Sequence, residues 1–597
     1  MITKKFFDPL NNYYKSKIGA VENGKKVRFR VKGEFDSVFF VYAKDGEREI
    51  YVLMDKKASC FELFCEFDVG LYTYYFIADG KKFYDDRIYQ LTVYDKNFKT
   101  PDWIKGGIIY QIFPDRFYQS PNYEYKSDRK IHQNKSDVPE FKPDKYGEVK
   151  NDDFFGGNLK GITEKLPYLK SLSVSAIYLN PIFKAYSNHR YDTGDYFTID
   201  PMLGTEDDLI NLIENAKALG IGIILDGVFN HVGADSLYFN KYGNYNSCGA
   251  YQSKDSPYYS WFDFIDYPND YRSWWGIKTL PSVNKDNKEF IRLICGEKGV
   301  IDKYTKLGVK GFRLDVVDEL PSEFVKNIRS ALKSSDKNAV LIGEVWEDAS
   351  NKISYGKRRE YLLGKELDSV MNYPLKNSII EYVLSGDCSY LSQTIREQID
   401  HYPKKVLDCL MNILSTHDTS RLLSILSGKN KADFTKEEDA LFSLDENDKK
   451  NAVFNLKCAV LLQYTLYGVP SVYYGDEAGL EGFYDPINRK YFPWDNINNE
   501  LYSWYVKLGK LRTSVSVFKS GKFKELFAHK GVYVFKRCDI SSSVVVAVNL
   551  SESETEFKFN GQIYEFFSEQ FYKSKFILSK KNFAVFLKTP LKVLTSN

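Results

Sequence analysis

The chain has 597 residues, which predicts about three or four domains because single hydrophobic cores stop growing well below this size. Its 83 Lys and Arg nearly balance its 80 Asp and Glu, and the net charge of +3 argues against a nucleic-acid partner or an anionic membrane surface. The hydrophobic share of 43% suffices for a large core, and no apolar run reaches the length of a membrane span.

Eight cysteines are scattered along the chain without a repeated spacing. Cys60 and Cys65 have no second pair and no histidine cluster to complete a metal site, so no metal is expected there. Reduced thiols are typical of a cytoplasmic protein, and this is the location we predict. The N-terminus shows no apolar leader segment, and a secreted protein whose leader was removed stays open as the alternative.

Residues 1–97 are expected to form a small antiparallel β-sandwich. Three short runs, 27–31, 38–42 and 71–77, are rich in β-branched and aromatic residues, and turn signals such as Lys44-Asp-Gly46 follow them. Such a domain could bind carbohydrate, form a dimer or serve only as a structural appendage, and the residues leave these three interpretations open.

Residues 98–512 show a different pattern, in which short apolar runs alternate with helical segments such as 206–219 and 451–466. Eight such runs indicate a (β/α)8 TIM barrel, an α/β fold in which helices surround parallel strands. The eight predicted strands are 108–113, 176–179, 221–225, 309–314, 339–342, 369–371, 411–414 and 471–474.

The connection after the third strand is too long for a simple loop. Residues 232–286 are rich in Tyr, Trp and Asn, and a segment of this length predicts an inserted subdomain over the site. Residues 513–597 return to a β pattern, with runs at 531–535, 543–548 and 583–587, and predict a second small β-sandwich.

Polar residues recur where five of the eight predicted strands end, which is where barrel enzymes assemble their sites. They follow strands three, four, five, seven and eight, and they are Asp226–His231, Arg313 with Asp315, Gly343–Trp346, Ser415–Thr419 and Gly475–Glu477.

Arg313 and Asp315 lie two residues apart at the end of the fourth strand, so strand alternation places both side chains on the same side. An arginine beside a carboxylate favours the ionised form, which a carboxylate nucleophile requires. A structural ion pair at the strand end explains these two residues equally well when they are considered alone.

The ordered set of blocks resembles the α-amylase family of glycoside hydrolases, and the flanking β domains resemble its neopullulanase, cyclomaltodextrinase and maltogenic amylase group. The supporting blocks are Tyr110–Phe117, Asn188–Tyr196, Gly468–Pro470 and Asp485–Arg489. The resemblance implies a retaining hydrolase that acts on an α-glucan, which would be its partner together with a second copy of the chain bound through the N-terminal domain.

The resemblance also implies a role for each residue of the site. Asp315 corresponds to the nucleophile, Glu344 to the general acid and base, and Asp418 to a third acid that binds sugar hydroxyls. Retention of configuration implies carboxyl groups about 5–5.5 Å apart. The residues expected to bind substrate are Tyr191, Asp226, His231, Arg313, Trp346, His417 and Arg489.

Two departures from the family pattern concern the metal site and the substrate preference. Many relatives bind calcium through an Asn/Asp-rich loop and a Gly-Gly-Asp turn, whereas this chain has Tyr118–Glu124 and Gly156-Gly157-Asn158. The loss of carboxylates weakens such a site, so no cofactor is expected to be required, and calcium binding stays open as the alternative. The inserted segment has Thr279–Asn284 in place of a Met-Pro-Lys-Leu-Asn block, which leaves open both the type of bond cleaved (α-1,4 or α-1,6) and the substrate (maltodextrin, cyclodextrin, pullulan or starch).

Two other functions stay open beside hydrolysis. A transglycosylase of the same family would use the same acids and pass the sugar to another sugar instead of water. A barrel that binds sugar without catalysis, as in the amylase-like subunits of amino-acid transporters, is less well supported, because those subunits carry a membrane helix and usually lack the acids.

Overall fold

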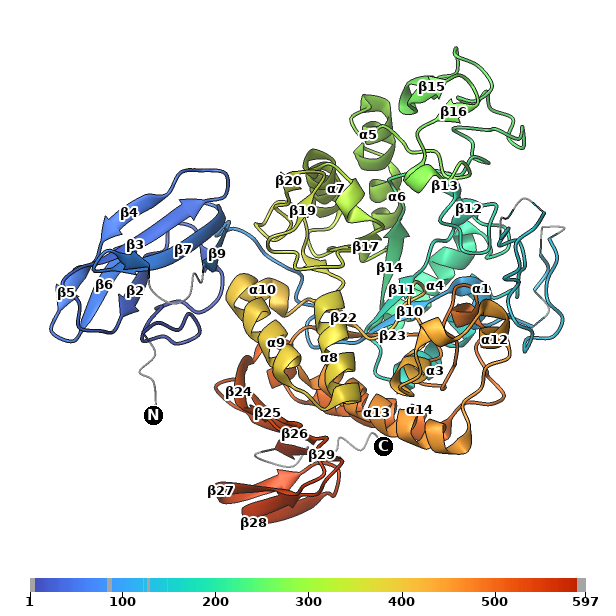
Figure 1. The fold of residues 1–597 in the computed structure, drawn as a ribbon. Coiled ribbons are helices and arrows are strands. Elements are labelled where there is room, and N and C mark those ends of the chain that lie inside the picture. The colour runs from blue at the N-terminus through green and yellow to red at the C-terminus, as the bar shows by residue number, and fades with distance from the viewer. Residues whose placement is uncertain are drawn as a thin grey trace.

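The computed structural model describes residues 6–82, 88–121, 123–125, 129–145, 147 and 149–587. A central barrel of strands and helices carries a β domain at each end of the chain, and an inserted segment projects from one end of the barrel (Figure 1). Within the described part of the chain, no helix combines the length and the apolar character needed to cross a bilayer.

The N-terminal domain is a sandwich of two sheets, as predicted. In β2 (Val27–Val31), the buried side chains of Val27, Phe29 and Val31 alternate with half-buried arginines, so one face supplies the core between the sheets. One sheet joins β1 (Val21–Glu22), β9 (Tyr89–Tyr94), β7 (Gly70–Ala78), β3 (Val38–Lys44) and β4 (Ile50–Leu53) in that order, with β8 (Lys81–Lys82) on β7, and the other joins β2, β6 (Cys60–Cys65) and β5 (Asp55–Lys57).

The central domain contains a closed barrel of eight parallel strands, which confirms the predicted (β/α)8 fold. An isolated parallel bridge between Met371 and Met411 joins the two ends of the sheet. The strands follow chain order around the barrel, and they are β10 (Ile109–Ile112), β11 (Ala176–Leu179), β14 (Gly222–Gly227), β17 (Gly311–Leu314), β18 (Val340–Gly343), β21 (Ser369–Val370), β22 (Met411–Ile413) and β23 (Val469–Tyr473).

Two of the predicted helices show how local signals set their limits. Helix α4 (Glu206–Ala218) begins where predicted, because Thr205 and Asp208 form a reciprocal capping box. Helix α13 (Glu446–Thr465) begins five residues before the predicted start at 451, because the side chain of Asp445 accepts a hydrogen bond from the backbone of Asp448.

The remaining helices are mostly short. They are α1 (Pro114–Phe117), α2 (Leu159–Glu164), α3 (Leu166–Ser171), α5 (Lys288–Cys295), α6 (Val300–Lys306), α7 (Ser322–Ser335), α8 (Tyr373–Ser385), α9 (Ser389–His401), α10 (Lys404–Leu407), α11 (Leu422–Leu426), α12 (Lys436–Ala440), α14 (Asn499–Ser514) and α15 (Val517–Ser520).

The segment between β14 and α5 folds over the carboxyl end of the barrel. An isolated bridge from His231 to Ser282 attaches it to the loop that follows β14, and a second bridge, from Phe262 to Val283, lies within the segment itself. Its regular elements are the 3₁₀ turns η1 (Tyr259–Trp261) and η2 (Trp274–Gly276) and the short strands β15 (Phe264–Asp266) and β16 (Asp270–Tyr271), near the top of Figure 1. Two further hairpins extend barrel loops, and they are β12 (Phe183–Ala185) with β13 (Thr193–Ile199) and β19 (Ile353–Ser354) with β20 (Lys357–Arg358).

The C-terminal domain is one antiparallel sheet in the order β24-β25-β26-β29-β27-β28. The predicted runs correspond to β25 (Val532–Cys538), β26 (Ser543–Asn549) and β29 (Asn582–Leu587). The sequence analysis missed β24 (Lys522–His529), β27 (Thr555–Glu565) and β28 (Gln570–Leu578), because their side chains are largely solvent-exposed and give no continuous apolar run.

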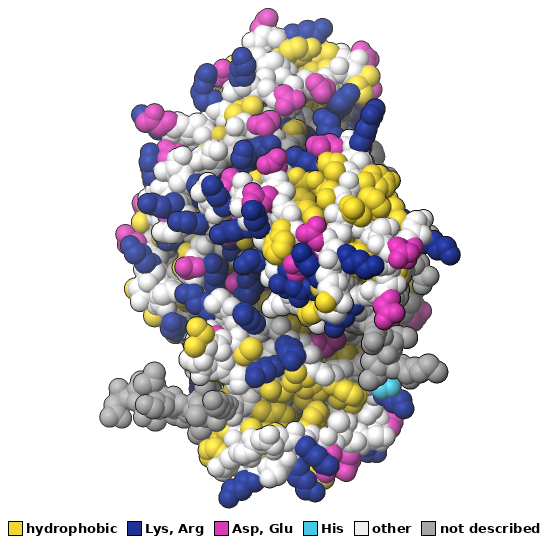
Figure 2. Space-filling view, turned by 90° about the vertical axis from the view of Figure 1, so that its left-hand side faces the viewer, with side chains coloured by type: hydrophobic (Ala, Val, Ile, Leu, Met, Phe, Trp, Pro, Cys, Tyr) yellow, Lys and Arg dark blue, Asp and Glu magenta, His cyan; other side chains and the backbone are white. Residues whose placement is uncertain are grey.

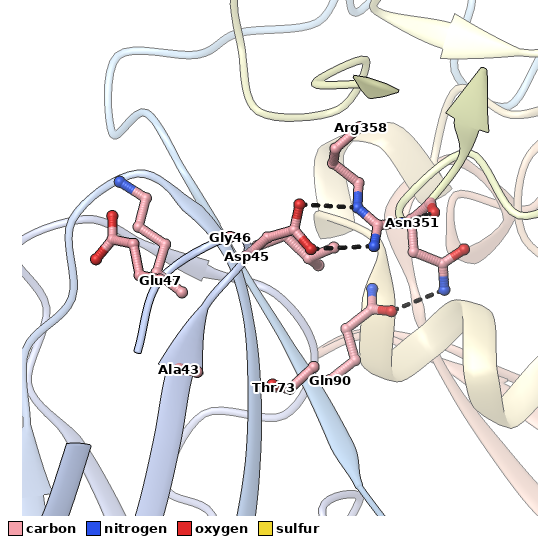
Figure 3. Close-up of a pocket in the computed structure, with 10 residues that line it drawn as sticks. Ala43, Asp45, Gly46, Glu47, Thr73, Gln90, Asn351 and Arg358 are labelled. Atoms are coloured by element: carbon pink, nitrogen blue, oxygen red, sulfur yellow. Dashed lines mark hydrogen bonds and ion pairs between the residues drawn. The ribbon is translucent and has the colours of Figure 1, made fainter. Parts of the chain in front are cut away.

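Polar contacts join the N-terminal domain to the barrel. Arg358 donates two hydrogen bonds to the carboxylate of Asp45, from Nε (3.1 Å) and from Nη2 (3.0 Å), and Asn351 donates one to Gln90 (Figure 3). A second ion pair is buried, with 2.8 Å between Nζ of Lys15 and Oδ1 of Asp400 in α9. On the neighbouring helix α8, the Tyr382 hydroxyl donates to backbone carbonyls of the C-terminal domain.

Candidate active site

A cavity of about 1200 Å³ opens at the carboxyl ends of the barrel strands. Asp315, Glu344 and Asp418 all line it, so the three acids predicted from separate blocks of the sequence meet at one site. The wall also includes Tyr191, His231, Trp346, His417 and Arg489, whereas Asp226 and Arg313 lie beneath it as the buried support of the acids.

Arg313, the third residue of β17, fixes the relative position of the central acids. Its Nη1 donates hydrogen bonds to Oδ1 of Asp226 (2.8 Å) and to Oδ1 of Asp315 (2.9 Å). Its Nη2 lies 2.9 Å from Oε2 of Glu344, an ion pair whose angle is unsuited to a hydrogen bond. One planar guanidinium therefore holds three carboxylates, which a lysine could not do with the same geometry.

Glu344 follows β18 directly, and both of its carboxyl oxygens have donors. Oε2 accepts a hydrogen bond from the backbone N–H of Val316 (2.8 Å), the residue after Asp315, and Oε1 accepts one from the indole of Trp346 (3.2 Å). Val316 has the left-handed backbone conformation (φ 38°, ψ 51°), which is costly for a β-branched residue and turns its N–H toward Glu344. The two acids are thus connected through the backbone as well as through Arg313.

The charges of the buried acids are coupled. Burial raises the pKa of Asp315, Arg313 opposes this shift, and Glu344 raises the pKa further. Like charges this close make it unfavourable for all the carboxyl groups to ionise together, so the proton that the acids retain is shared among them.

Asp226, the fifth residue of β14, has every oxygen occupied by the protein. Its Oδ2 accepts hydrogen bonds from the hydroxyls of Tyr178 (2.6 Å) and Tyr191 (2.8 Å), and its Oδ1 accepts from Arg313. Burial raises the pKa of this carboxyl, and Arg313 opposes the shift. The structure therefore gives Asp226 the role of positioning Arg313 and Tyr191, rather than the direct sugar contact that the sequence predicted.

His417 is a neutral donor whose proton can be placed on one nitrogen. Its Nδ1 lies 3.0 Å from the amide nitrogen of Gln111, which can only donate, so the ring proton is on Nε2. This Nε2 donates to the Tyr191 hydroxyl (2.6 Å), and the two rings stack with 5.1 Å between centroids and 4° between planes. Burial lowers the pKa of His417 well below its usual range.

Asp418 and Arg489 meet on the far wall of the cavity. Nη2 of Arg489 lies 3.6 Å from Oδ1 of Asp418, while its Nε donates to the backbone carbonyl of His417 (3.0 Å). The Asp418 side chain is 34% exposed toward the cavity and otherwise surrounded by protein. Burial in the cleft raises the pKa of the Asp418 carboxyl, and the negative charge of Glu344 raises it further.

His231 presents a proton donor to the cavity wall. Its Nδ1 accepts from the amide of Asn230 (3.3 Å), whose oxygen is fixed by Lys285, so Nε2 carries the proton. Among the described residues, this Nε2 has no hydrogen-bond partner. Burial lowers the pKa of His231 to about 3, so the ring is neutral, and it stacks on Trp274 with 5.3 Å between centroids.

A family model described as "Alpha amylase, catalytic domain" matches residues 111–503 of this chain. The chain belongs to the α-amylase family. The matched residues contain all eight barrel strands except the first two residues of β10, and they contain all three acids of the cavity.

Individual proteins agree with this assignment. An amylopullulanase of Thermoanaerobacter thermohydrosulfuricus is 36% identical over 609 residues, which cover 89% of this chain and 40% of that protein. A cyclomaltodextrinase of Bacillus sp is 30% identical, covering 88% of this chain and 92% of that protein. The solved type III pullulan hydrolase of Thermococcus kodakarensis has a TM-score of 0.70 and 26% identity, and the match covers 98% and 100% of the two chains. This chain spans less than half the length of the amylopullulanases that it matches.

The sequence analysis missed several side chains that support this α-amylase-type site. Gln111 in β10, and Tyr178 and Asn180 at the end of β11, hold His417, Asp226 and Tyr191 respectively. The strand-end rule could have found them, since it applies equally to the first two strands, where no polar cluster was noted.

One strand-end cluster was wrongly placed with the site. Asp476 and Glu477 follow β23 but lie outside the cavity wall, since Asp476 pairs with Arg421 and Glu477 accepts from Tyr110 and Tyr168. Burial raises the pKa of Asp476 to about 6 and that of Glu477 to about 7.

The predicted lack of a metal site stays a prediction. Within the described part of the chain, no group of three or more His, Cys, Asp or Glu residues could hold a metal ion. Asn158 caps α2, with its Oδ1 accepting from Gly161 (2.8 Å), which occupies the oxygen that a cation would need. Asn122, in the loop where relatives bind calcium, lies outside the described residues.

Proposed function

We propose that this protein is a retaining α-glucan hydrolase that cleaves α-1,4 glucosidic bonds, and α-1,6 bonds in substrates that carry them. The observation that carries the proposal is the single guanidinium of Arg313 bound to both Asp315 and Glu344 at the wall of one cavity. Retaining glycosidases need two carboxyl groups close enough to act on one anomeric carbon without a water molecule between them. The curated relatives supply the class of substrate, an α-glucan.

In the first step, Asp315 forms a bond to the anomeric carbon while the bond to the leaving oxygen breaks. Arg313 occupies Oδ1, and among the described residues no hydrogen bond reaches Oδ2, which is the oxygen left to attack. Glu344 gives its proton to the departing sugar, because the leaving oxygen must not depart as an alkoxide. The product of this step is a glycosyl ester on Asp315 and a shortened glucan.

In the second step, Glu344 as a carboxylate takes a proton from water, and the water oxygen replaces Asp315 on the anomeric carbon. Two inversions give retention. Asp418, Arg489 and the Nε2–H of His231 would bind the hydroxyls of the reacting sugar. These contacts speed the reaction only if they become stronger as the sugar ring flattens and gains positive charge in the transition state.

The direct test is incubation of the purified protein with maltoheptaose, cyclodextrin and pullulan. We expect new reducing ends, with the α-anomer as the first product by NMR. First appearance of the β-anomer would refute retention. No cleavage of any of the three substrates would refute the function and favour a sugar-binding scaffold.

Transglycosylation is the second function that the same geometry permits. Trp346 is exposed beside Glu344, and its ring stacks on that of Tyr373 with 3.9 Å between the centroids. It offers an apolar face on which an acceptor sugar could bind in place of water. Products longer than the substrate, formed from a single malto-oligosaccharide, would show this activity, and their proportion should rise with substrate concentration.

We also propose that two copies associate through the N-terminal domain. Ile50, Tyr51 and Leu53 of the edge strand β4 are each about half exposed, and an unpaired edge strand with apolar side chains is a natural site for a second chain. Figure 2 shows hydrophobic patches on the face where this domain lies, among mixed positive and negative charges. Sedimentation should show a dimer that Leu53→Glu dissociates, and a monomeric wild-type protein would contradict this.

The eight cysteines are free thiols, which supports our proposal of a cytoplasmic location. For the metal, we propose that neither folding nor catalysis requires one. Exhaustive treatment with a chelator should leave the melting temperature and the rate of maltoheptaose cleavage unchanged, and a loss that calcium restores would contradict the proposal.

A further inference from the structure

The turn η2 carries an aromatic side chain with no structural role of its own. Trp275 is 82% exposed, although burying a large aromatic ring is favourable for folding. Its backbone has the left-handed conformation (φ 50°, ψ 27°), which is uncommon and unfavourable for a bulky residue. The fold therefore keeps Trp275 at a position where both its side chain and its backbone are unfavourable.

The backbone around Trp275 is firmly held, so its exposure is a fixed feature. Trp274 N–H donates to the carbonyl of Leu280, and Ile277 N–H donates to the carbonyl of Trp274, both at 2.9 Å. An isolated bridge joins Ser273 to Pro281, and Val232 N–H bonds the carbonyl of Pro281. The turn is thereby attached to the loop that carries His231.

The turn also reaches the wall of the active-site cavity through contacts between aromatic rings. Trp274 stacks on His231, and the centroids of Trp274 and Trp275 are 6.0 Å apart. Trp275 lines the same cavity as the three acids, together with the exposed rings and apolar side chains of Tyr242 and Ile277. A single exposed apolar residue needs no explanation, but three that line the outer part of an active-site cavity form a surface suited to a ligand.

We propose that Trp275 is a specificity-determining residue whose indole face stacks on an outer glucosyl unit of a bound α-glucan, beyond the units at the catalytic acids. This inference rests on the proposed function for the identity of the ligand. The faces of glucose rings carry C–H groups that pack on flat aromatic rings, and an indole offers the largest such face among the amino acids. The substrate class it would favour is long α-glucan chains over short ones.

Binding can be tested independently of cleavage. In the Asp315→Asn background, calorimetry with maltoheptaose should give a Kd about tenfold higher when Trp275 is replaced by Gly, a factor that corresponds to about 1.4 kcal/mol. Glycine suits the left-handed backbone, so the turn keeps its shape while the ring is lost. Trp275→Tyr keeps an aromatic face and should recover most of the affinity.

Kinetics give the second readout. In the otherwise wild-type enzyme, Trp275→Gly should reduce kcat/KM for maltoheptaose about tenfold more than for maltotriose, mainly through KM, because only the longer chain reaches the turn. Tyr390→Ala, which removes an exposed ring from α9 away from the cavity, is the matched control and should change neither value.

An equal loss of kcat/KM for maltoheptaose and maltotriose would overturn the inference, as would an unchanged Kd for maltoheptaose. It would also be overturned if Trp275→Tyr bound maltoheptaose as weakly as Trp275→Gly. If the wild-type protein cleaves neither sugar, the proposed function fails while the calorimetric comparison still decides whether Trp275 binds the glucan. The two failures are therefore distinguishable.

Discussion

Arg313 is the residue on which the arrangement of the acids depends. Its side chain is fully buried, and its contacts to Asp226, Asp315 and Glu344 use the planar fork of the guanidinium. A single ammonium group could contact one or two of these acids but could not hold all three in the same geometry. The reacting geometry is thus set by one side chain that does not itself exchange a proton.

We therefore expect Arg313→Lys to lower kcat on the order of 100-fold, the loss typical of removing one preorganised charged contact, although the net charge is unchanged. Steady-state kinetics on maltoheptaose measures the effect. Arg292→Lys, at an exposed ion pair in α5, is the matched control and should retain full activity. A fully active Arg313→Lys enzyme would show that the fork is dispensable.

Glu366 illustrates a buried acid that the reaction does not use. Burial raises its pKa from 4.5 to about 7, against the opposing effects of the Ser322 hydroxyl and Lys326. Because the folded state binds this proton more tightly than the unfolded chain, its stabilising contribution is complete below about pH 4.5 and is lost as the pH rises toward 7.

Glu366→Gln should therefore raise the melting temperature at pH 8 and leave it unchanged near pH 4, with activity retained. The exposed Glu214→Gln on α4 should have no effect at either pH. Asp476 and Glu477 also have raised pKa values, so they too make the melting temperature fall as the pH rises through this range. The substitution Glu366→Gln should therefore remove only part of the pH dependence of the melting temperature. A melting temperature lowered at pH 8 would contradict the expectation.

At the scale of the element, the sequence predicted best what is local and periodic. The barrel strands are almost entirely buried, so most of them give a short, mainly apolar run that is visible in the sequence alone. The capping box at Thr205 specifies the start of α4. The three acids belong to polar clusters that come after three of these strands, and the resemblance to the α-amylase family implied their roles.

What the sequence did not predict depends on contacts between distant segments. The stacking of Trp274 on His231 joins residues 43 positions apart within an insertion that has no periodic pattern. Gln111 bonds His417 across more than 300 residues, and nothing near Gln111 in the chain identifies that partner. The strands β27 and β28 were missed because they face solvent on most of their length.

Docking of the N-terminal domain should depend on its buried contact more than on its exposed one. The Lys15–Asp400 pair has side chains 0% and 8% exposed, whereas the Arg358–Asp45 pair has 27% and 38%. Asp400→Ala leaves an unpaired buried ammonium and should cost about 3–5 kcal/mol. Asp45→Ala, the matched exposed change, should cost about 0–1 kcal/mol.

Urea unfolding followed by fluorescence would measure both variants. Similar losses for the two would contradict the expectation, because they would mean that burial does not decide the strength of the contact. Loss of maltotriose cleavage in Asp45→Ala, with stability retained, would instead point to a role of this junction in catalysis.

At the scale of the whole molecule, the barrel brings distant parts of the chain to one cavity. The acids lie on loops after β17, β18 and β22, and most of the aromatic rings that line the cavity come from the insertion and from the loop after β11. Arg489 comes from a segment after β23, the last barrel strand. The β domains lie at the periphery of the barrel (Figure 1). The proposed chemistry and the proposed preference for long chains would thereby belong to different residues of one cleft.

The central claim is that Asp315 forms a covalent bond with the sugar while Glu344 transfers protons. The variant Glu344→Gln, given α-maltosyl fluoride, needs no acid for fluoride to leave but lacks the base for the second step, so the glycosyl ester should accumulate. Peptide mapping by mass spectrometry should then find one maltosyl unit on the peptide that contains Asp315, and none in the double variant with Asp315→Asn. An adduct on another residue, or fluoride release with no adduct and a β-anomeric product, would contradict the account.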